Sequence, residues 1–517
     1  MDKMREELRL AIALVLAGII IFIFGRYQAR QAPHAARPAL PQTVSSAKET
    51  PEEKPIAFSH ASRTIRGKEE IYEDSRFIIK LDTAGGIIRD IGLKEYTRKD
   101  EASIPILEDS DLLLNHAADD TENVPASYAF SKTGSVISFQ DYSGNMLTEK
   151  TINIPADSYT FSSALLISNR GKDSISLKNY MVSAGRIDIA NMRSRIAKER
   201  QFTPPEIIIS TGGKMVKTSI TRIRASSTFE NTDWIALKQR YGLLLIRSER
   251  STKSFVTLED SCIRIGFLYE KMDIKPGDSE KLGFSFYAGP SDYFIAGKEI
   301  AEKQIFGTGF FASMGRFLFT ALSYIHTAVP NWGWSIILLT LIVKIVFFPL
   351  TRKSLRSMKE MQKLRPYLQD VQKKYKNNPQ QMQKELMNLY REYKINPFGG
   401  CLPMLIQFPI FIGFFIALRS SVILRGAPFM LWIKDLSLPD TIMKIGGFNL
   451  NLLPVIMSVT SFWQQKLTPQ EPSQKALTFM MPVMFLFLFY NFSSGLLLYW
   501  TTMNAAGLVE QYFVHKK

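Results

Sequence analysis

The chain has 517 residues, enough for two or three domains, and its formal net charge is +16. Apolar residues make up 46% of it, but they gather in long runs almost free of charge, whereas residues 27–300 have the composition of a soluble protein. This contrast excludes a wholly soluble protein and indicates a membrane protein with one large water-exposed region. The two cysteines, Cys262 and Cys401, lie in different regions without metal-ligand spacing, so neither a disulfide nor a metal site is expected.

The chain begins with a candidate membrane anchor. Leu10 to Phe24 is an uninterrupted apolar run of 15 residues, and no strict A-x-A cleavage site follows it. We therefore interpret residues 1–26 as an uncleaved transmembrane anchor rather than a signal peptide. Residues 27–57 contain five prolines among Ala, Gln, Ser and Glu, a composition that predicts a flexible linker.

Residues 58–306 consist of short β-branched runs separated by turn signals. The segment Ile71–Gly92 is interrupted by Gly85-Gly86, as in a β-hairpin. This pattern predicts an all-β sandwich domain over residues 58–306. Similar runs are Ser135–Tyr142, Ser158–Asn169, Tyr241–Arg247 and Leu282–Tyr287.

Residues 307–330 are apolar enough to be counted as a membrane span. However, Ser313, Arg316 and Thr320 lie along one flank of the helix that these residues would form. This pattern favours an amphipathic helix lying in the membrane interface over one that crosses it.

Residues 331–517 contain five further apolar runs, which predict an α-helical membrane core of five spans. Residues 351–396, between the first and second runs, carry 12 lysines and arginines against 4 acidic residues, so the positive-inside rule places this loop in the cytoplasm. Counting from it gives six spans with the anchor included, both termini in the cytoplasm, and the β domain outside. The approximate bounds of the five runs are 331–350, 401–418, 449–465, 476–492 and 495–509.

The basic loop itself has a helical pattern. Apolar residues recur at steps of three and four, Pro366 is expected to kink the first stretch, and Asn377-Asn378-Pro379 breaks it. Residues 351–396 therefore predict an antiparallel helical hairpin. Its apolar faces pack on each other in the simplest interpretation, but flexible methionines also suit promiscuous contact with apolar substrates. These methionines are Met358, Met361, Met382 and Met387.

One charge stands inside the first run of the core. Lys344 lies within Ser335–Leu350, and a charge at mid-helix costs about 2.5–3.5 kcal/mol on insertion scales. Snorkelling of the side chain to the cytoplasmic interface is one explanation. Thr340, one turn away on the same face, favours a polar stripe instead.

The later runs also contain uncharged polar residues. Each one alone is typical of a helix–helix hydrogen bond, but together with Lys344 they could line a hydrated groove between helices. They are Gln407, Gln464, Gln465, Thr501, Thr502 and Asn504. No Walker A, G-x-S-x-G or H-E-x-x-H pattern occurs in the sequence, so no cofactor, ATP-driven machine or hydrolase is indicated.

Four segments resemble the hallmark segments of the YidC membrane insertases, in the same order and spacing. They are Asn331–Leu350 (NWGWSIILLTLIVKIVFFPL), Asn396–Phe411 (NPFGGCLPMLIQFPIF), Ala427–Leu436 (APFMLWIKDL) and Ser494–Asn504 (SGLLLYWTTMN). The anchor with its β domain resembles the Gram-negative form, which has a large periplasmic β-sandwich. The resemblance implies an inner-membrane insertase and chaperone that inserts and folds integral membrane proteins and is not an enzyme.

The resemblance also implies a site. Members of the family use a hydrophilic groove with one positive charge that attracts acidic parts of the substrate; that residue, usually Arg, falls on Lys344 here. Lysine keeps the charge but lacks the planar, bidentate fork of Arg. Thr340, Tyr499 and Asn504 match groove-side positions. A further departure is Ser493, where Pro often precedes the Ser-Gly.

The implied partners follow from the same resemblance. They are nascent membrane proteins, the Sec translocon (SecYEG with SecDF), the ribosome, the signal recognition particle receptor and membrane lipids, but not DNA. The basic outer face of the hairpin could meet lipid headgroups, ribosomal RNA or both.

Two other classes of protein compete with this interpretation. A polytopic transporter or channel with an accessory β domain would also carry intramembrane polar residues, but the five-span core shows no inverted repeat and a single deep charge. An enzyme in the β domain is the second, because such sandwiches resemble sugar mutarotases. His116 within the domain and His60 at its edge are too few for a histidine-rich acid–base site.

Overall fold

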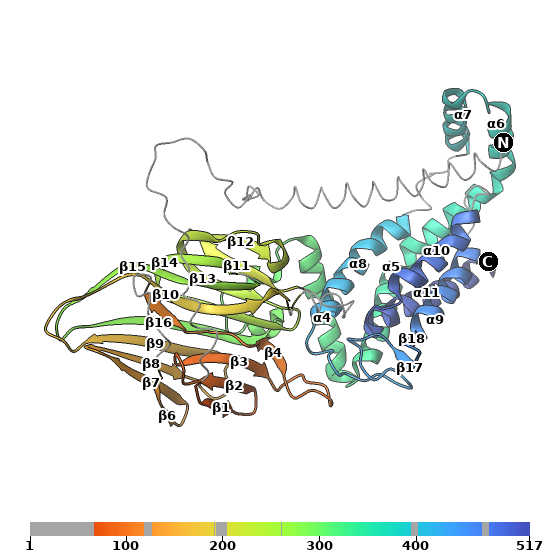
Figure 1. Ribbon diagram of the computed structural model, residues 1–517. Helices are drawn as coiled ribbons and strands as arrows, with labels where there is room; N and C mark the ends of the chain where they lie inside the picture. The colour runs from red at the N-terminus through yellow and green to blue at the C-terminus, as the bar shows by residue number, and fades with distance from the viewer. Residues whose placement is uncertain are drawn as a thin grey trace.

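The computed structural model describes residues 67–117, 127–190, 192, 204–259, 261–393, 402–467 and 475–516. Within these residues a β-rich region and a helical region lie side by side (Figure 1). The predicted anchor, residues 1–26, and the predicted linker, residues 27–57, lie outside the described residues.

A four-stranded antiparallel sheet opens the β-rich region. Its strands follow chain order: β1 (Glu69–Glu73), β2 (Phe77–Asp82), β3 (Ile87–Leu93) and β4 (Ile104–Leu107). Gly85 and Gly86 turn the chain between β2 and β3, both with positive φ, a conformation that glycine adopts without steric cost. The hairpin predicted for this segment is confirmed.

A twelve-stranded sheet forms the rest of the β-rich region. Its main path runs β12-β11-β13-β14-β16-β9-β8-β7-β6, and β15, β10 and β5 branch from β14. The branch forms because β14 is long: its first half pairs with β16 and its second half with β15. The strands are β5 (Asn115–Ala117), β6 (Ala129–Thr133), β7 (Val136–Ser143), β8 (Met146–Asn153), β9 (Thr160–Asn169), β10 (Ile175–Asp188), β11 (Glu206–Thr211), β12 (Lys214–Ser219), β13 (Ser227–Lys238), β14 (Gly242–Glu259), β15 (Cys262–Ile274) and β16 (Ser279–Pro290).

One apolar core joins the two sheets. Phe77 of β2 meets Phe161 of β9 edge to face, with ring centroids 6.5 Å apart, and Phe161 stacks on Phe286 of β16 at 5.2 Å. All three side chains are buried, so the small sheet is fastened to the large one by aromatic packing. The predicted all-β sandwich is confirmed (Figure 1).

Helices make up the second region. They include α4 (Phe310–Ala328), α5 (Trp332–Lys363), α6 (Arg365–Lys374), α7 (Pro379–Glu392), α8 (Leu402–Ser420), α9 (Leu453–Leu467), α10 (Lys475–Phe489) and α11 (Ser494–Lys516). Short helices are η2 (Ile220–Arg222), α3 (Tyr293–Ala296) and η3 (Lys303–Phe306), and a hairpin of β17 (Thr441–Ile445) and β18 (Phe448–Asn451) precedes α9.

Among the described residues, only the stretch Trp332–Met361 in α5 has the length and apolar composition of a membrane-crossing helix. Gln407–Arg419 and Met480–Phe489 are shorter apolar helices.

Each of the five apolar runs of the core contains a helix, and the helix bounds differ from the approximate bounds of the runs. The third run was expected to start at residue 449, whereas α9 begins at Leu453, because Asn449 and Asn451 pair in the β17–β18 hairpin. The fifth was expected to end at 509, whereas α11 continues to Lys516. α11 continues past the apolar run through Glu510 and Gln511, which apolar composition alone does not include.

Three of these helices contain an interior proline: Pro349 in α5, Pro409 in α8 and Pro482 in α10. Proline has no N–H, so the carbonyl one turn earlier, Ile345 in the case of α5, loses its usual helical donor. Helices bend most easily at such points.

The helical hairpin forms as the sequence predicts, with one difference in the position of its first break. α5 ends at Lys363 and α6 starts at Arg365, so Pro366 stands in the first turn of a new helix rather than inside a kinked one. Asn378 caps α7 by accepting a hydrogen bond from the N–H of Gln381 at 3.1 Å.

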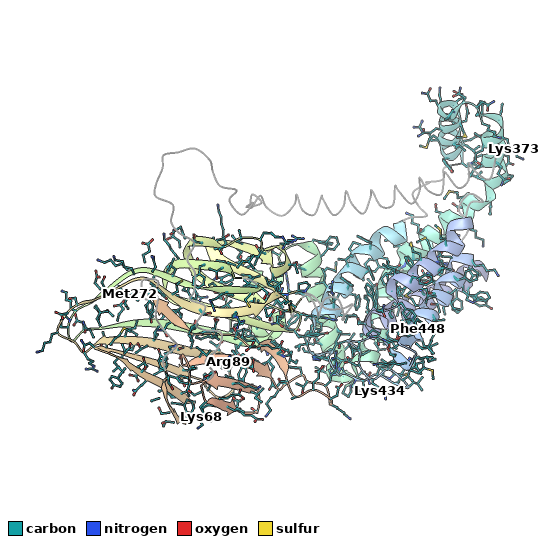
Figure 2. All side chains as sticks on the ribbon, viewed as in Figure 1. Lys68, Arg89, Met272, Lys373, Lys434 and Phe448 are labelled. Carbon is teal, nitrogen blue, oxygen red and sulfur yellow. The ribbon has the colours of Figure 1, made fainter. Side chains whose placement is uncertain are left out.

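The β-rich and helical regions interlock. Val422, which follows α8, is fully buried in the core of the β-rich region, and Phe294, which follows β16, stacks on Phe319 of α4 at 5.2 Å. An ion pair between Arg98 Nε and Asp435 Oδ2, at 2.6 Å, joins the same two regions. Lys373 of the hairpin and Lys434 of the loop beside this junction lie at opposite ends of the helical region (Figure 2).

A buried lysine lies between the two sheets. Lys150 of β8 is 1% exposed, and its ammonium donates to the carbonyls of Gly85 at 2.5 Å and Leu113 at 2.8 Å. Burial lowers the pKa of Lys150 to about 7, against a weaker opposing effect from Asp141.

The pH dependence of stability follows from this shift. Between about pH 7 and pH 10.5 the unfolded chain holds a proton on Lys150 that the folded chain has released, so the free energy of unfolding rises with pH in that window. We expect Lys150→Met to remove this rise. Thermal unfolding of the full-length protein, followed by circular dichroism from about pH 6 to pH 9, checks it. A difference between wild type and variant that stays constant with pH would contradict the shift.

Candidate functional site

A cavity of about 480 Å³ lies among five helices of the core. Most of its surface is apolar, and we call it the polar cavity for the ion pair and the amides that line it. It is bounded by α5, α8, α9, α10 and α11, which also form one apolar cluster. The lining residues are Lys344, Thr351, Leu355, Gln407, Phe408, Phe411, Ser461, Gln464, Gln465, Met481, Phe485, Tyr499, Trp500, Asn504, Gly507, Glu510 and Gln511. Aromatic side chains line it together with amides and charged groups, and α8 and α11 each supply both kinds.

An ion pair joins two of the lining helices. Lys344 Nζ of α5 lies 2.8 Å from Glu510 Oε2 of α11, and the two side chains are only 16% and 6% exposed. The second carboxylate oxygen, Glu510 Oε1, is buried without a hydrogen-bond partner among the described residues. Each charge offsets the cost of burying the other. Removal of either partner would leave the remaining charge buried without compensation.

A glycine makes room for this pair. A Cβ on Gly507 of α11 would lie 2.4 Å from Gln464 Nε2 and 3.6 Å from Lys344 Nζ. Any side chain at this position would therefore displace Gln464 of α9 first. The absence of a side chain at residue 507 lets an amide and an ammonium approach the surface of α11.

Asn504 connects two walls of the cavity. Its Nδ2 donates to Ser461 Oγ of α9 at 2.6 Å, and the residue is 4% exposed. An interhelical hydrogen bond between side chains is one of the interactions that hold membrane helices together.

The structure brings most of the predicted polar residues together in this cavity. Five of the seven named groove residues line it: Lys344, Gln407, Gln464, Tyr499 and Asn504. The two others do not. Thr340 is fully buried and donates a hydrogen bond to the carbonyl of Ile336 in its own helix at 2.6 Å. Thr501 does not line the cavity, and its hydroxyl has no hydrogen-bond partner among the described residues.

Glu510 is the residue that the sequence analysis missed. It lies one residue beyond the predicted end of the last span, so Lys344 was taken as the single deep charge, which was wrong. The signal was present in the sequence, because Glu510 follows Tyr499 by about three helical turns and therefore shares its face of α11.

The methionines of the hairpin lie apart from the cavity. Met387 is exposed and Met361 and Met382 are half-buried, while the side chain of Met358 lies outside the described set. α6 and α7 lie side by side beyond the end of the core (Figure 1). Tyr367 and Tyr393 pack between them with ring centroids 5.9 Å apart.

Comparison with known proteins agrees with this arrangement. The sequence family described as 60Kd inner membrane protein matches residues 324–517, and the one described as YidC periplasmic domain matches residues 73–319. The membrane protein insertase YidC of Cupriavidus taiwanensis is 31% identical over 464 residues, which cover 84% of this chain and 80% of that protein.

Two further similarities are partial or distant. The membrane protein insertase YidC of Endomicrobium trichonymphae is 43% identical over 248 residues, which cover 47% of this chain and about half, 48%, of that protein. A structure described as an active YidC insertase with its first transmembrane domain resolved is 21% identical, covers 87% of this chain and 93% of that one, and has a TM-score of 0.40.

A helical region with an ion-paired cavity and an attached β-sandwich defines the class: a two-part protein whose helical part contains a stretch able to cross a membrane. Among such proteins, the chain belongs to the YidC family of membrane protein insertases. It is accordingly an inner-membrane protein with a periplasmic domain, acts on nascent membrane proteins, and is not an enzyme.

The hydrogen bond of Asn504 predicts a difference between two neighbouring substitutions. Asn504→Ala removes the bond to Ser461 and should lower the free energy of unfolding in mixed micelles by about 0.6–1.7 kcal/mol. Thr501→Ala, on the same helix, removes a buried hydroxyl without a described partner, so no hydrogen bond is lost and the free energy of unfolding should not fall by a comparable amount. Equal effects of the two variants would show that the bond does not hold α9 to α11.

The ion pair predicts strong coupling between its partners. Lys344→Met or Glu510→Gln alone leaves one group without its counter-charge and should cost about 3 kcal/mol of unfolding free energy. The double variant should cost clearly less than the sum of the two, because no unpaired charge remains. A double-mutant cycle in mixed micelles measures this coupling, and additive costs would mean that the two groups do not interact.

Proposed function

We propose that the polar cavity is the groove through which this insertase passes the polar flank of a substrate, with Lys344 as its charged contact. The observation that carries the proposal is the Lys344–Glu510 pair inside a cavity that also contains Gln407, Gln464 and Asn504. Such a cavity shortens the distance over which a polar flank must cross hydrocarbon.

The proposed topology has six spans with both termini in the cytoplasm. The basic hairpin supports it, since its 12 lysines and arginines against 4 acidic residues favour the cytoplasmic side. Lys373 of the hairpin and Lys434 beside the β-rich region lie at opposite ends of the core, as this orientation requires (Figure 2). The anchor 1–26, linker 27–57, β-sandwich domain 58–306, interfacial helix 307–330 and core 331–517 complete the proposed organisation.

An interfacial position for α4 is supported by its surface. Leu318, Phe319 and Leu322 are buried on one side, while Phe317 and Tyr324 are exposed on the other. A helix packed on protein along one face and apolar along another suits the boundary between lipid and water.

Substrate entry is proposed at the hairpin, α6 and α7. Met361, Met382 and Met387, with Met358 nearby in sequence, offer flexible apolar contacts to segments of differing shape. The basic outer face would meet the ribosome, the signal recognition particle receptor or lipid headgroups at the same side. Cooperation with the Sec translocon (SecYEG with SecDF) is part of the proposal and rests on the family resemblance.

Charge exchange is the proposed central step. An acidic residue in the substrate's flank competes with Glu510 for Lys344, so the lysine stays paired before, during and after passage. The apolar segment of the substrate leaves sideways along α5, where Ile345 and Val346 are exposed. Its transfer into lipid supplies the free energy, because apolar surface is removed from water.

Insertion into proteoliposomes tests this step. For a single-span substrate with a short acidic outer tail, Lys344→Ala should lower the rate of insertion about tenfold, the equivalent of one lost charge contact, and Lys344→Arg should restore it. Glu510→Gln should insert the same substrate at least as fast as wild type, because the competing carboxylate is gone.

The control is the same substrate with a neutral tail, for which Lys344→Ala and wild type should insert at equal rates. If Lys344→Ala inserts the acidic substrate as well as wild type does, the lysine is a snorkelling residue and the charge exchange is wrong. Thr501→Ala, whose hydroxyl lies outside the cavity lining, serves as the matched variant.

A further inference from the structure

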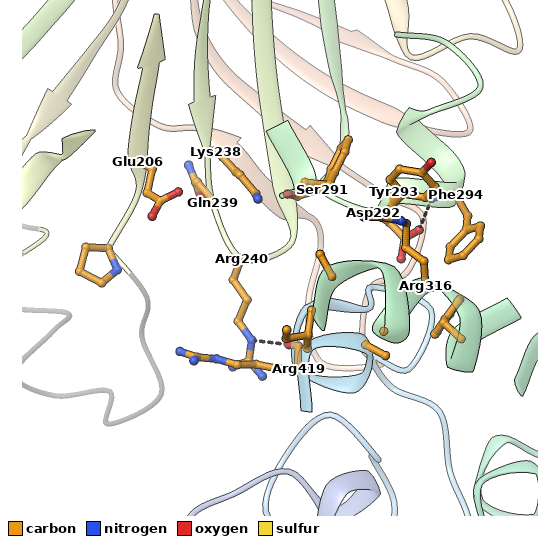
Figure 3. A pocket seen from close by; sticks show the side chains of 17 residues that line it. Glu206, Lys238, Gln239, Arg240, Ser291, Asp292, Tyr293, Phe294, Arg316 and Arg419 are labelled. Carbon is orange, nitrogen blue, oxygen red and sulfur yellow. Dashed lines mark hydrogen bonds between the residues drawn. The ribbon is translucent and has the colours of Figure 1, made fainter. Parts of the chain in front are cut away.

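A second pocket lies where the β-rich region meets the helices. It has a volume of about 280 Å³ and is built from β11, β13, the segment after β16, α4 and α8 (Figure 3). Its polar residues come from both regions of the molecule, so it exists only when the two are joined. It is separate in its lining from the cavity that holds Lys344.

The pocket is rich in positive charge. Four cations line it, against the two carboxylates of Glu206 and Asp292. The cations are Lys238, Arg240, Arg316 and Arg419. Two more positive than negative groups therefore face one small space, which favours an anion there.

The cations are held in place by main-chain carbonyls. Arg240 Nε donates to the carbonyl of Arg419 at 3.1 Å, and Lys238 Nζ donates to that of Ile305 at 3.1 Å. Arg316 Nη1 donates to the carbonyl of Gly307, also at 3.1 Å. These bonds fix the positions of Arg240, Lys238 and Arg316 through neutral acceptors.

Mutual repulsion among the cations is visible at Arg240. Burial lowers the pKa of its guanidinium, and the nearby charges of Arg419 and Arg98 lower it further, against raising effects of Tyr241 and Asp435. A bound anion would relieve this repulsion.

A polar group without a partner faces the same pocket. Ser291 is 4% exposed, and its hydroxyl has no hydrogen-bond partner among the described residues. Figure 3 shows Lys238 extending toward Ser291, whereas the side chain of Arg240 runs from the same region of the pocket to Arg419. A buried hydroxyl left unpaired costs free energy, which an acceptor in the pocket would recover.

A third pocket, lined by apolar and polar residues, adjoins the cationic one. It has a volume of about 320 Å³ and shares Arg240 and Arg419 with it, so these two arginines stand between the two spaces. The apolar part of its lining is Phe415, Leu488, Phe492 and Leu496 from α8, α10 and α11 and the turn between the last two. Leu488 is exposed on the outer surface of the core, where lipid would meet it in a bilayer.

From this juxtaposition we infer that the junction binds one anionic glycerophospholipid of the outer leaflet, its phosphate between Arg240 and Arg419 and an acyl chain against Phe415 and Leu488. A charged space next to a partly apolar one matches a molecule with a phosphate at one end and hydrocarbon at the other. The inference rests on the proposed orientation, with the β-rich region outside the bilayer.

Native mass spectrometry of the full-length protein in detergent tests the inference. Dioleoylphosphatidylglycerol is titrated against dioleoylphosphatidylcholine, which has the same acyl chains and no net charge, and against glycerophosphoglycerol, which has the same headgroup and no acyl chains. Wild type should bind the anionic lipid about tenfold more tightly than either of the others, and the double variant Arg240→Gln, Arg419→Gln should lose this preference.

Two further variants separate binding from misfolding. The double variant Arg240→Lys, Arg419→Lys keeps both charges and should keep the preference, and Arg170→Gln, an exposed arginine in the β-rich region, should behave as wild type. Equal binding of the two lipids, or an unchanged preference in the glutamine variant, would overturn the inference. Tight binding of glycerophosphoglycerol would show that a soluble anion, not a lipid, occupies the pocket.

Lipid binding by native mass spectrometry does not require the protein to insert a substrate, so its outcome is independent of the insertion assay. A lipid preference that depends on Arg240 and Arg419 would therefore stand even if Lys344→Ala inserted the acidic substrate normally, and the proposed charge exchange alone would fail.

Discussion

An ionised lysine inside an apolar helix must be given a partner, and the arrangement of the helical core follows from that requirement. Lys344 of α5 is paired with Glu510, which requires α11 to lie against α5 at this depth. Gly507 leaves the space that Gln464 occupies beside this pair, since a Cβ there would lie 2.4 Å from Gln464 Nε2. Asn504, one turn before, fixes α9 to the same helix. A single pair of opposite charges thus fixes α5 against α11, the hydrogen bond of Asn504 adds α9, and apolar packing adds α8 and α10.

The pair also sets the resting charge of the cavity. Lys344 and Glu510 together carry no net charge, so an acidic substrate meets a salt bridge and not a free cation. Lysine suits such exchange, because its compact ammonium makes rotatable single contacts, whereas an arginine would hold a carboxylate by two parallel hydrogen bonds. The cationic pocket at the junction differs from this cavity in its net charge, since its positive groups outnumber its carboxylates.

The sequence predicts the parts of this structure that depend on one segment at a time. Long apolar runs give the helices, and Asn378 with Pro379 gives the start of α7. What depends on two segments could not be predicted in the same way. The role of Glu510 becomes apparent only when α11 is placed beside Lys344 of α5. Similarly, α9 starts after residue 451 because Asn451 pairs with Thr441 in the β17–β18 hairpin. The pocket of Arg240 and Arg419 joins residues 179 positions apart, which no local pattern reveals.

The interior prolines make some of the helices around the cavity easier to bend than others. Pro349, Pro409 and Pro482 weaken α5, α8 and α10, whereas α9 and α11 have no such interruption and are tied by Asn504. We expect the first three helices to bend while the other two stay fixed. The aperture is then adjustable on one side only, and segments of different bulk can be accommodated by elastic widening, without a separate conformation of the protein for each.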